Sequence, residues 1–276
     1  MGRLIACLEI GGGCIANAAR IETTSGPFFL KYSSQDPGET FEAEAAGLDA
    51  LRAAESPLLI PQVLAARNRT DQEAGYVLMD WIEQGPPNRL FAERFGTALA
   101  SLHRSEGPAF GFHSDNFIGR LPQANAWLDA WPSFFVERRL EPQVRLARDA
   151  GRWNASWSRK FARLVSNLRG LLPESPEPSI LHGDLWSGNY LTSSTGQAVL
   201  IDPAVYHGHR EADLAMTELF GRFDSGFYAA YRETWPLEDG YEQRREVYNL
   251  YHLINHLNHF GSSYASSVER VLRRFG

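Results

Sequence analysis

Short apolar runs separated by turn residues fill the first third of the chain. Glycine, serine and proline interrupt these runs, so each of them predicts a short strand. The predicted strands cover residues 4–8, 15–23, 28–32, 63–67 and 76–80. A helix is predicted over residues 40–54, with Thr40 as its N-cap and an inner stripe of Phe41, Ala45, Leu48 and Leu51. The pattern indicates a small, mainly antiparallel sheet with one helix.

After residue 88 the apolar residues recur mainly at helical spacing. The prolines and the glycine at 84–88 predict a linker, because they interrupt both helices and strands. Helices are predicted over residues 91–102, 161–172 and 241–260, helical core over 125–135, and two short strands with a turn between them over 180–182 and 198–201. The chain is therefore expected to form an α+β fold with two lobes: a β-rich lobe (1–83) that ends in a hinge, and a larger, mainly helical lobe (84–276).

Composition and charge exclude several classes of protein. The chain has 276 residues, of which 43% are hydrophobic, and this is enough apolar material for a globular core. A net charge of −6 argues against partners such as nucleic acid or an anionic membrane, which favour basic proteins. Two cysteines, Cys7 and Cys14, cannot form a disulfide-rich scaffold. Because neither a membrane-spanning run nor a signal-peptide pattern is present, we expect a cytoplasmic protein, either a monomer or a weak dimer.

One lysine interrupts an otherwise apolar strand. Lys31 lies in the run FFLKY, where its ammonium group could simply reach water from an edge strand. However, Glu44 shares the inward face of the following helix with Leu48 and Leu51, and a buried carboxylate is costly unless a cation pairs with it. The two residues are therefore expected to form an ion pair. A strand lysine paired with a helix glutamate orients the nucleotide phosphates in protein kinases.

Three glycines, Gly11, Gly12 and Gly13, separate the first two predicted strands. A glycine-rich turn at this place could bring backbone N–H groups close to phosphates, although three glycines also suit a simple hairpin turn. No Gly-Lys-Ser/Thr follows them, so they do not form a Walker loop. The thiol of Cys14, which ends the turn, is expected to be inert.

The segment LHGDLWSGN at 181–189 carries the strongest chemical signal. Asp184 and Asn189 have the spacing of a kinase catalytic loop, in which a carboxylate orients the attacking hydroxyl and an amide oxygen holds Mg²⁺. Asp202 ends the next β-run and could bridge a metal ion to the phosphates. Two Asx turns that flank a hairpin would be the alternative. The presence of Lys31 and Glu44 upstream, in the matching order, favours the catalytic interpretation.

Three histidines, His252, His256 and His259, follow helical spacing near the end of the chain. A zinc site would need all three to converge together with a further ligand. Packing and hydrogen bonding are the more common roles of such residues, and a polar lining for a sugar-like substrate is the better functional alternative.

Several long strings resemble the fructosamine kinases, also called ketosamine-3-kinases. The resemblance covers nearly the whole chain. The strings that carry it are GGGCIANA (11–18), GLDAL after Glu44, FGFHSDNFIGRLPQANAWLDAWPSFFVERRL (110–140), LHGDLWSGN (181–189), IDPAVYHGHREADLAM (201–216) and LYHLINHLNHFGSSY (250–264). The HGD-x-x-x-x-N spacing alone indicates only the wider aminoglycoside- and choline-kinase-like group, whereas DLWSGN and DPAVYHGHRE are typical of the fructosamine kinases. The resemblance implies a protein-kinase-like fold that binds ATP between its lobes.

The resemblance also implies roles for individual residues. Asp184 would be the catalytic base, and Asn189 and Asp202 would hold Mg²⁺. The nucleotide-binding residues would be Gly11, Gly12 and Gly13 in the first turn, Lys31 with its partner Glu44, and the hinge residues Asp80, Trp81 and Ile82. Trp186 and His256 would line the acceptor pocket.

The expected reaction moves the γ-phosphoryl group of ATP to the 3-hydroxyl of a ketosamine, either free or on a glycated protein. The phosphorylated product would then eliminate, which leads to deglycation. Two alternatives remain at this point: a kinase of another hydroxylated amine, such as an aminoglycoside or choline, and a nucleotide-binding regulator without turnover.

Overall fold

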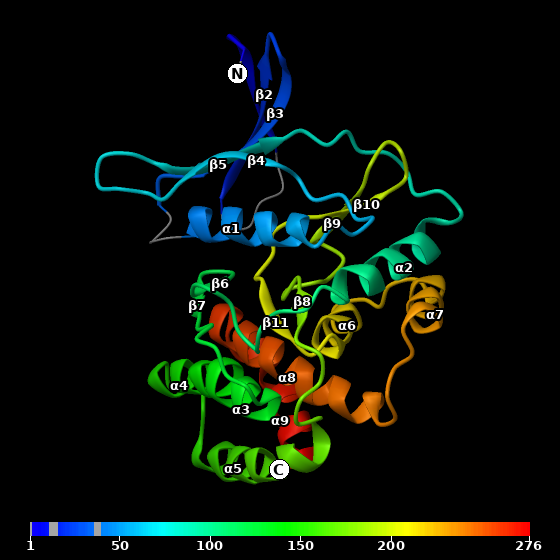
Figure 1. Ribbon diagram of the computed structural model, residues 1–276. Helices are drawn as coiled ribbons and strands as arrows, with labels where there is room; N and C mark the ends of the chain where they lie inside the picture. Colours follow the sequence, from blue (N-terminus) through cyan, green and yellow to red (C-terminus); the bar gives the residue numbers. More distant parts are fainter. Residues whose placement is uncertain (1, 11–15, 36–39) are drawn as a thin grey trace.

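The computed structural model describes residues 2–10, 16–35 and 40–276, and Figure 1 shows a small sheet above a larger group of helices. The strands of the sheet are β1 (Leu4–Ile10), β2 (Asn17–Thr23), β3 (Gly26–Ser33), β4 (Val63–Arg67) and β5 (Gly75–Asp80). They are antiparallel and lie in the order β1-β2-β3-β5-β4. Helix α1 (Thr40–Ala53) lies beneath this sheet in Figure 1. The prediction of a five-stranded antiparallel sheet with one helix is therefore confirmed.

Helix α1 connects the sheet to the rest of the molecule. Its predicted apolar stripe is buried, including Phe41, Leu48 and Leu51. A Cβ atom at Gly47 would lie 3.2 Å from Val205 and 3.3 Å from Pro203, so the absence of a side chain lets the helix approach the segment that follows β10 (Ala198–Leu200). Because of this close approach, residues of α1 and residues that follow β10 can form one site.

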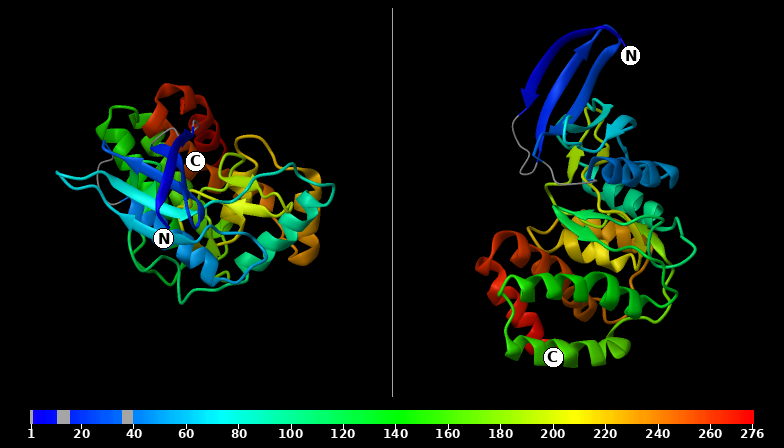
Figure 2. Two further views of the ribbon diagram at one scale, coloured as in Figure 1. Left: turned by 90° about the horizontal axis from the view of Figure 1, so that it is seen from above. Right: turned by 90° about the vertical axis from the view of Figure 1, so that its left-hand side faces the viewer.

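Helices form most of the second lobe, as predicted (Figure 2). They are α2 (Phe91–His103), α3 (Trp131–Phe134), a π-helical turn (Phe135–Leu140), α4 (Glu141–Asp149), α5 (Ala155–Leu171), α6 (Glu211–Thr217), α7 (Ser225–Thr234), α8 (Tyr241–Phe260), a 3₁₀ turn (Ser262–Tyr264) and α9 (Ala265–Phe275). The short strands among them are β6 (Asn116–Ile118), β7 (Leu121–Gln123), β8 (Ser179–Leu181), β9 (Tyr190–Thr192), β10 and β11 (Tyr206–Gly208). The predicted α+β fold is therefore confirmed.

The middle of the chain differs from the sequence-based prediction in several places, and the paired strands β6 and β7 were not predicted at all. Strands β8 and β10 are present, but β8 pairs with β11 and β10 pairs with β9, two strands that the pattern did not predict. Three residues are too few to display a period, so tertiary pairing decided these strands. The expectation of helical core over 125–135 was wrong for residues 125–130, because helix α3 begins only at Trp131. The side chain of Asn125 instead bonds Asn116 (2.9 Å) and the buried guanidinium of Arg139 (2.7 Å).

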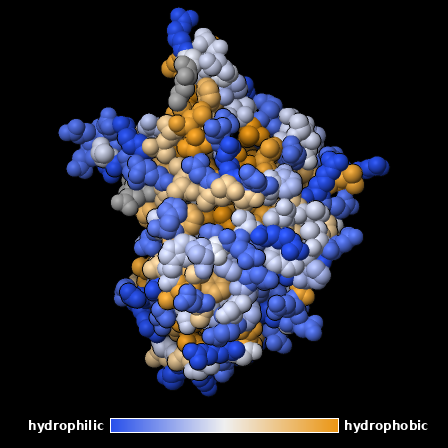
Figure 3. Space-filling model, in the orientation of Figure 1, coloured by the Kyte–Doolittle hydropathy of each residue, from blue (hydrophilic) through white to orange (hydrophobic). Residues whose placement is uncertain are grey.

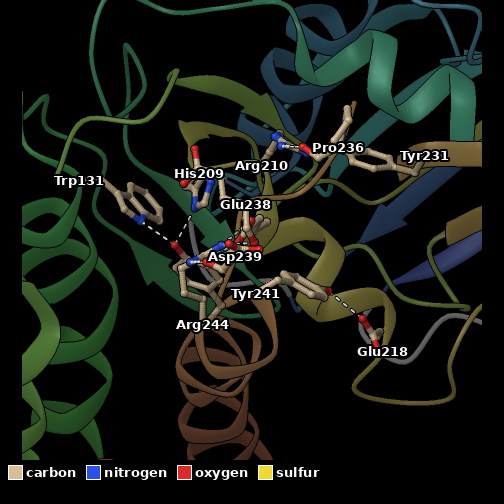
Figure 4. A network of polar contacts seen from close by, with 12 residues as sticks. Trp131, His209, Arg210, Glu218, Tyr231, Pro236, Glu238, Asp239, Tyr241 and Arg244 are labelled. Atoms are coloured by element: carbon tan, nitrogen blue, oxygen red, sulfur yellow. Dashed lines mark hydrogen bonds and ion pairs between the residues drawn. The ribbon is translucent and has the colours of Figure 1, made fainter. Parts of the chain in front are cut away.

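A buried polar network holds α8 against α6, and Figure 4 shows Arg244 of this network beside Glu238 and Asp239. The guanidinium of Arg244 on α8 donates to both carboxylate oxygens of Glu211 on α6, over 2.6 and 2.9 Å. It also donates to the backbone carbonyl groups of Asp239 and Glu238. Because both ends of this buried ion pair are satisfied by hydrogen bonds, α8 has a fixed position against α6.

Apolar side chains remain exposed on the sheet lobe, and Figure 3 shows orange, apolar residues on the visible face of this lobe. Leu4, Ile5 and Leu8 on the outer strand β1 are more than half exposed.

Within the described part of the chain, no helix combines the length and the apolar character that crossing a membrane requires.

Candidate active site

Three charged side chains from distant parts of the chain meet where α1 approaches the segment after β10. The ammonium group of Lys31 on β3 donates to Glu44 Oε2 and to Asp202 Oδ1, each over 2.8 Å. Glu44 faces inward from α1, one turn before the buried Leu48, as its spacing predicted. Asp202 comes from the other lobe, so this ion-paired group joins the two lobes.

Each charge in this group shifts the pKa values of its neighbours. Burial would lower the pKa of Lys31, but the carboxylates of Glu44 and Asp202 outweigh it and raise the pKa, so the lysine stays protonated. Burial would raise the pKa of Asp202, but the ammonium of Lys31 outweighs it and holds the pKa below its usual value. Burial raises the pKa of Glu44 to about 7, against the opposing effect of Lys31. Asp202 is therefore ionised and half exposed, which suits a ligand for a divalent cation.

The loop between β8 and β9 carries Asp184 and Asn189. The side-chain amide of Asn189 donates to the backbone carbonyl (2.8 Å) and to Oδ2 (3.1 Å) of Asp184. Among the described residues nothing donates to the side-chain oxygen of Asn189, so this atom can bind another ligand. The backbone carbonyl of Asn189 accepts a hydrogen bond from Ile201 N (3.1 Å), next to Asp202. The loop thus presents a carboxylate and an amide oxygen beside the ion-paired group.

Burial raises the pKa of Asp184 to about 7. The hydrogen bond from Asn189 acts against this effect, and the negative charges of Asp202 and Asp213 reinforce it. A carboxyl group with a pKa close to neutral pH is suited to accepting a proton from a hydroxyl group.

Asp213 on α6 fixes the backbone of the same loop, a role that the sequence analysis missed. Its carboxylate accepts hydrogen bonds from His182 N (2.7 Å) and Gly183 N (2.9 Å), and His103 on α2 lies 3.3 Å from it. The ring of His182 in turn contacts the carbonyl of Ile201 over 2.9 Å. Asp213 lies inside one of the strings that resemble the fructosamine kinases, but no local spacing distinguished it from other helical carboxylates.

The backbone at Gly183 requires a residue without a side chain. Its φ is +84°, and a Cβ atom would lie 2.0 Å from Ala204 O. We expect Gly183→Ala to lower the free energy of unfolding by about 2 kcal/mol or more, because strain and a backbone clash add up. Gly170→Ala is the matched control, since nothing lies within 4 Å of that exposed helical position. Urea unfolding that left Gly183→Ala as stable as wild type would contradict this account.

Of the predicted hinge residues, Asp80 ends β5 and Trp81 and Ile82 follow it, and all three lie half-buried. The guanidinium of Arg20 on β2 stacks over the Trp81 ring at 4.6 Å, and the indole N–H donates to Glu83 (2.8 Å). These contacts give Trp81 a defined orientation where the chain leaves the sheet.

Trp186 and His256, the two residues expected to line the acceptor pocket, meet through a third aromatic residue. Phe220 stands edge-on to Trp186 with ring centroids 6.4 Å apart, and its ring lies 4.4 Å from that of His256. Trp186 is 37% exposed and lies two residues after Asp184. The sequence analysis did not identify Phe220, because it lies outside every motif.

The predicted glycine turn and the late histidines remain to be placed. Gly11, Gly12, Gly13 and Cys14 lie outside the described residues. Of the three late histidines, His256 contacts the carbonyl of His252 through Nδ1 (2.8 Å), and His259 contacts the carbonyl of Ile118 through Nε2 (3.2 Å). These contacts favour the hydrogen-bonding interpretation over a zinc site.

Comparison with known proteins identifies the family. The family model described as "Fructosamine kinase" matches residues 5–275. A protein of Enterococcus faecium named a probable ketoamine kinase is 39% identical over 97% of this chain and 94% of its own length. The chloroplastic protein-ribulosamine 3-kinase of Arabidopsis thaliana is also 39% identical, over 96% of this chain and 80% of its own.

Solved structures agree with this family and with the fold. A Thermobifida fusca protein provisionally described as a fructosamine-3-kinase superimposes with a TM-score of 0.89 at 35% identity, covering 99% of this chain and 93% of that chain. An aminoglycoside phosphotransferase superimposes with a TM-score of 0.64 at 14% identity, covering 99% and 95%, and thus shares the protein-kinase-like fold. The chain belongs to the fructosamine kinase family and is a phosphotransferase.

Proposed function

We propose that the protein transfers the γ-phosphoryl group of ATP to the 3-hydroxyl of a ketosamine, such as a fructosamine or a ribulosamine, free or attached to a protein. Elimination of the 3-phosphate from the product, followed by hydrolysis of the C–N bond by water, would then release the amine, so the biological role would be deglycation. The observation that carries this proposal is the convergence of Lys31, Asp184, Asn189 and Asp202 in a chain of a kinase family.

Each member of this group has a chemical role in phosphoryl transfer. Asp184 accepts the proton of the acceptor hydroxyl, and its pKa near 7 suits this task. Lys31 binds phosphate oxygens, and Glu44 keeps the ammonium in place from the opposite side. Most of the rate enhancement then comes from positioning and from electrostatic stabilisation of the phosphate charge.

The oxygen ligands of the site fit Mg²⁺. The amide nitrogen of Asn189 donates to Asp184, and its side-chain oxygen has no donor in the part of the chain that the structure describes, while Asp202 offers an ionised carboxylate. Magnesium prefers a few such protein oxygens together with phosphate and water. When bound, the ion would neutralise phosphate charge and orient the triphosphate.

The other predicted binding residues complete the proposal. The backbone of Asp80, Trp81 and Ile82 would meet the adenine, and the turn Gly11-Gly12-Gly13 would lie over the phosphates. Trp186 and His256 would contact the sugar or its amine substituent. In this division, residues 1–83 form the nucleotide-binding lobe, and residues 84–276 form the catalytic and acceptor lobe.

A direct assay tests the proposal. The purified protein is incubated with ATP, Mg²⁺ and, in turn, fructosyl-lysine, ribulosyl-lysine, kanamycin and choline, and NMR locates any phosphoryl group gained. We expect phosphorylation of a ketosamine at its 3-hydroxyl. Activity on kanamycin or choline alone would assign another acceptor. A nucleotide-dependent rise in melting temperature without phosphorylation of any acceptor would indicate a binding protein without turnover.

A further inference from the structure

A buried histidine outside the roles assigned above faces the proposed catalytic base. His252 lies in the second half of α8, and its side chain is 5% exposed. Its Nδ1 atom is 3.9 Å from Asp184 Oδ1 and has no hydrogen-bond partner among the described residues. A buried polar atom without a partner costs free energy, so its retention at this place requires a reason.

The two oxygens of the Asp184 carboxylate have different surroundings. Oδ2 accepts a hydrogen bond from Asn189 Nδ2 over 3.1 Å, whereas Oδ1 is the oxygen that His252 faces. An ionised carboxylate accepts hydrogen bonds but cannot donate them. An imidazole lone pair aimed at Oδ1 would repel it, whereas an N–H group would be attracted.

The environment of the imidazole also favours the neutral ring. Burial, with a smaller contribution from His256, lowers the pKa of His252 to about 3. A neutral imidazole carries its single proton on either Nδ1 or Nε2. The charge of the facing carboxylate favours the tautomer with the proton on Nδ1.

We propose that His252 is a positioning residue for Asp184, with its Nδ1–H group directed at Oδ1. The proposal rests on the proposed role of Asp184. Donors on both oxygens, Asn189 on one side and His252 on the other, then fix the plane of the carboxylate. Because each carboxylate oxygen accepts two hydrogen bonds, Oδ1 keeps a lone pair for the acceptor hydroxyl.

Helix α8 is a rigid support for such a residue. The neighbouring Tyr251 donates to Gln123 Oε1 (2.7 Å), and the amide of Gln123 donates to Ala204 O (3.0 Å), two residues after Asp202. The buried ion pair between Arg244 and Glu211 holds the same helix against α6. Tyr251 is thus connected through Gln123 to the segment after Asp202, and the adjacent His252 faces Asp184. These contacts give the imidazole a defined position relative to the carboxylate.

Two substitutions of His252 separate hydrogen bonding from packing. His252→Asn places an amide group near the position of Nδ1, whereas His252→Leu fills the space without a donor. We expect His252→Leu to lower kcat about 10- to 100-fold with little change in the KM for ATP, because the base loses its orientation. His252→Asn should recover most of that loss. His259→Asn, on the same helix, should leave kcat unchanged, and melting temperatures report whether each variant is folded.

The opposite order of activities would overturn the proposal. If His252→Leu kept wild-type kcat while His252→Asn lost it, the imidazole would serve packing alone. The ¹⁵N NMR spectrum of the histidine rings gives a second test that needs no acceptor. We expect the Nδ1–H tautomer for His252 in the presence of Mg²⁺ and a non-hydrolysable ATP analogue, and an Nε2–H tautomer would exclude the proposed contact. Absence of ketosamine phosphorylation by wild type would instead refute the proposed function, while the tautomer would still decide the role of His252.

Discussion

Asp184→Asn is expected to lower kcat by about 1,000-fold, because the amide cannot accept the proton of the acceptor hydroxyl. The substitution preserves the size of the side chain, so the hydrogen-bonded loop of Asp184 and Asn189 should keep its shape. The dissociation constant of ATP should change little, since Lys31 and Asp202 remain. Steady-state kinetics on a ketosamine together with calorimetric ATP binding would measure both effects.

The same variant has a predictable effect on stability. In the folded protein the pKa of Asp184 is raised to about 7. Between the ordinary carboxyl pKa of about 4 and this value, the folded state binds more protons than the unfolded state, so this group makes stability fall as pH rises through that window. Asp184→Asn removes this loss and should raise the melting temperature relative to wild type at pH 8 more than at pH 4.

Two results would contradict this view of Asp184. Full activity of Asp184→Asn would remove it from the role of base. An equal change in melting temperature at both pH values would show that its carboxyl group titrates normally in the folded protein. Asp149→Asn, an exposed substitution at the end of α4, serves as the control for both measurements.

Asp202→Asn is expected to lower kcat at least about 100-fold and to raise the concentration of Mg²⁺ needed for half-maximal activity. The carboxylate is the only full negative charge in the proposed pair of metal ligands, and it also pairs with Lys31 over 2.8 Å. The backbone of Asp202 has a φ of +54°, which asparagine tolerates better than alanine, so the substitution tests charge with little added strain.

A magnesium titration distinguishes this role from a structural one. If Asp202→Asn lowered kcat while the Mg²⁺ requirement stayed that of wild type, the carboxylate would act only through its ion pair with Lys31. Lys31→Met in the same assay should raise the KM for ATP without changing the dependence on Mg²⁺, because its ammonium group is proposed to bind phosphate oxygens.

The sequence predicted the sheet lobe well because its elements are long enough to display a period. Each strand from β1 to β5 overlaps its predicted range, and α1 buries the predicted stripe, including Leu48 and Leu51. The strands of three residues were harder to predict: β6, β7, β9 and β11 were missed, because three residues are too few to display a period. The stretch 125–130 was misread as helix, because Trp127 is 39% exposed rather than packed on a helical face, and Leu128 pairs with Phe110 in an isolated β-bridge.

In the candidate site, too, some contacts could be predicted from local sequence and others could not. The contact between Lys31 and Glu44 could be foreseen, because an inward carboxylate and a lysine in an apolar strand each require an opposite charge. The contacts of Asp213 and His252 could not be predicted, because a carboxylate or an imidazole in a helix has no local feature that shows which loop it will face. Phe220 likewise joins Trp186 and His256 only in three dimensions.

Amphipathic periods, the costs of burying charge and the spacing of a short motif are properties of short segments. They were enough to determine the two-lobed α+β architecture, the ion pair of Lys31 and the loop that carries Asp184 and Asn189. The tertiary structure decided which groups surround that loop. Only the folded chain brings Asp213 under the backbone of the loop, Asp202 beside Lys31 and His252 opposite Oδ1 of Asp184. These contacts join residues far apart along the chain, and their geometry depends on helix packing that no single segment encodes.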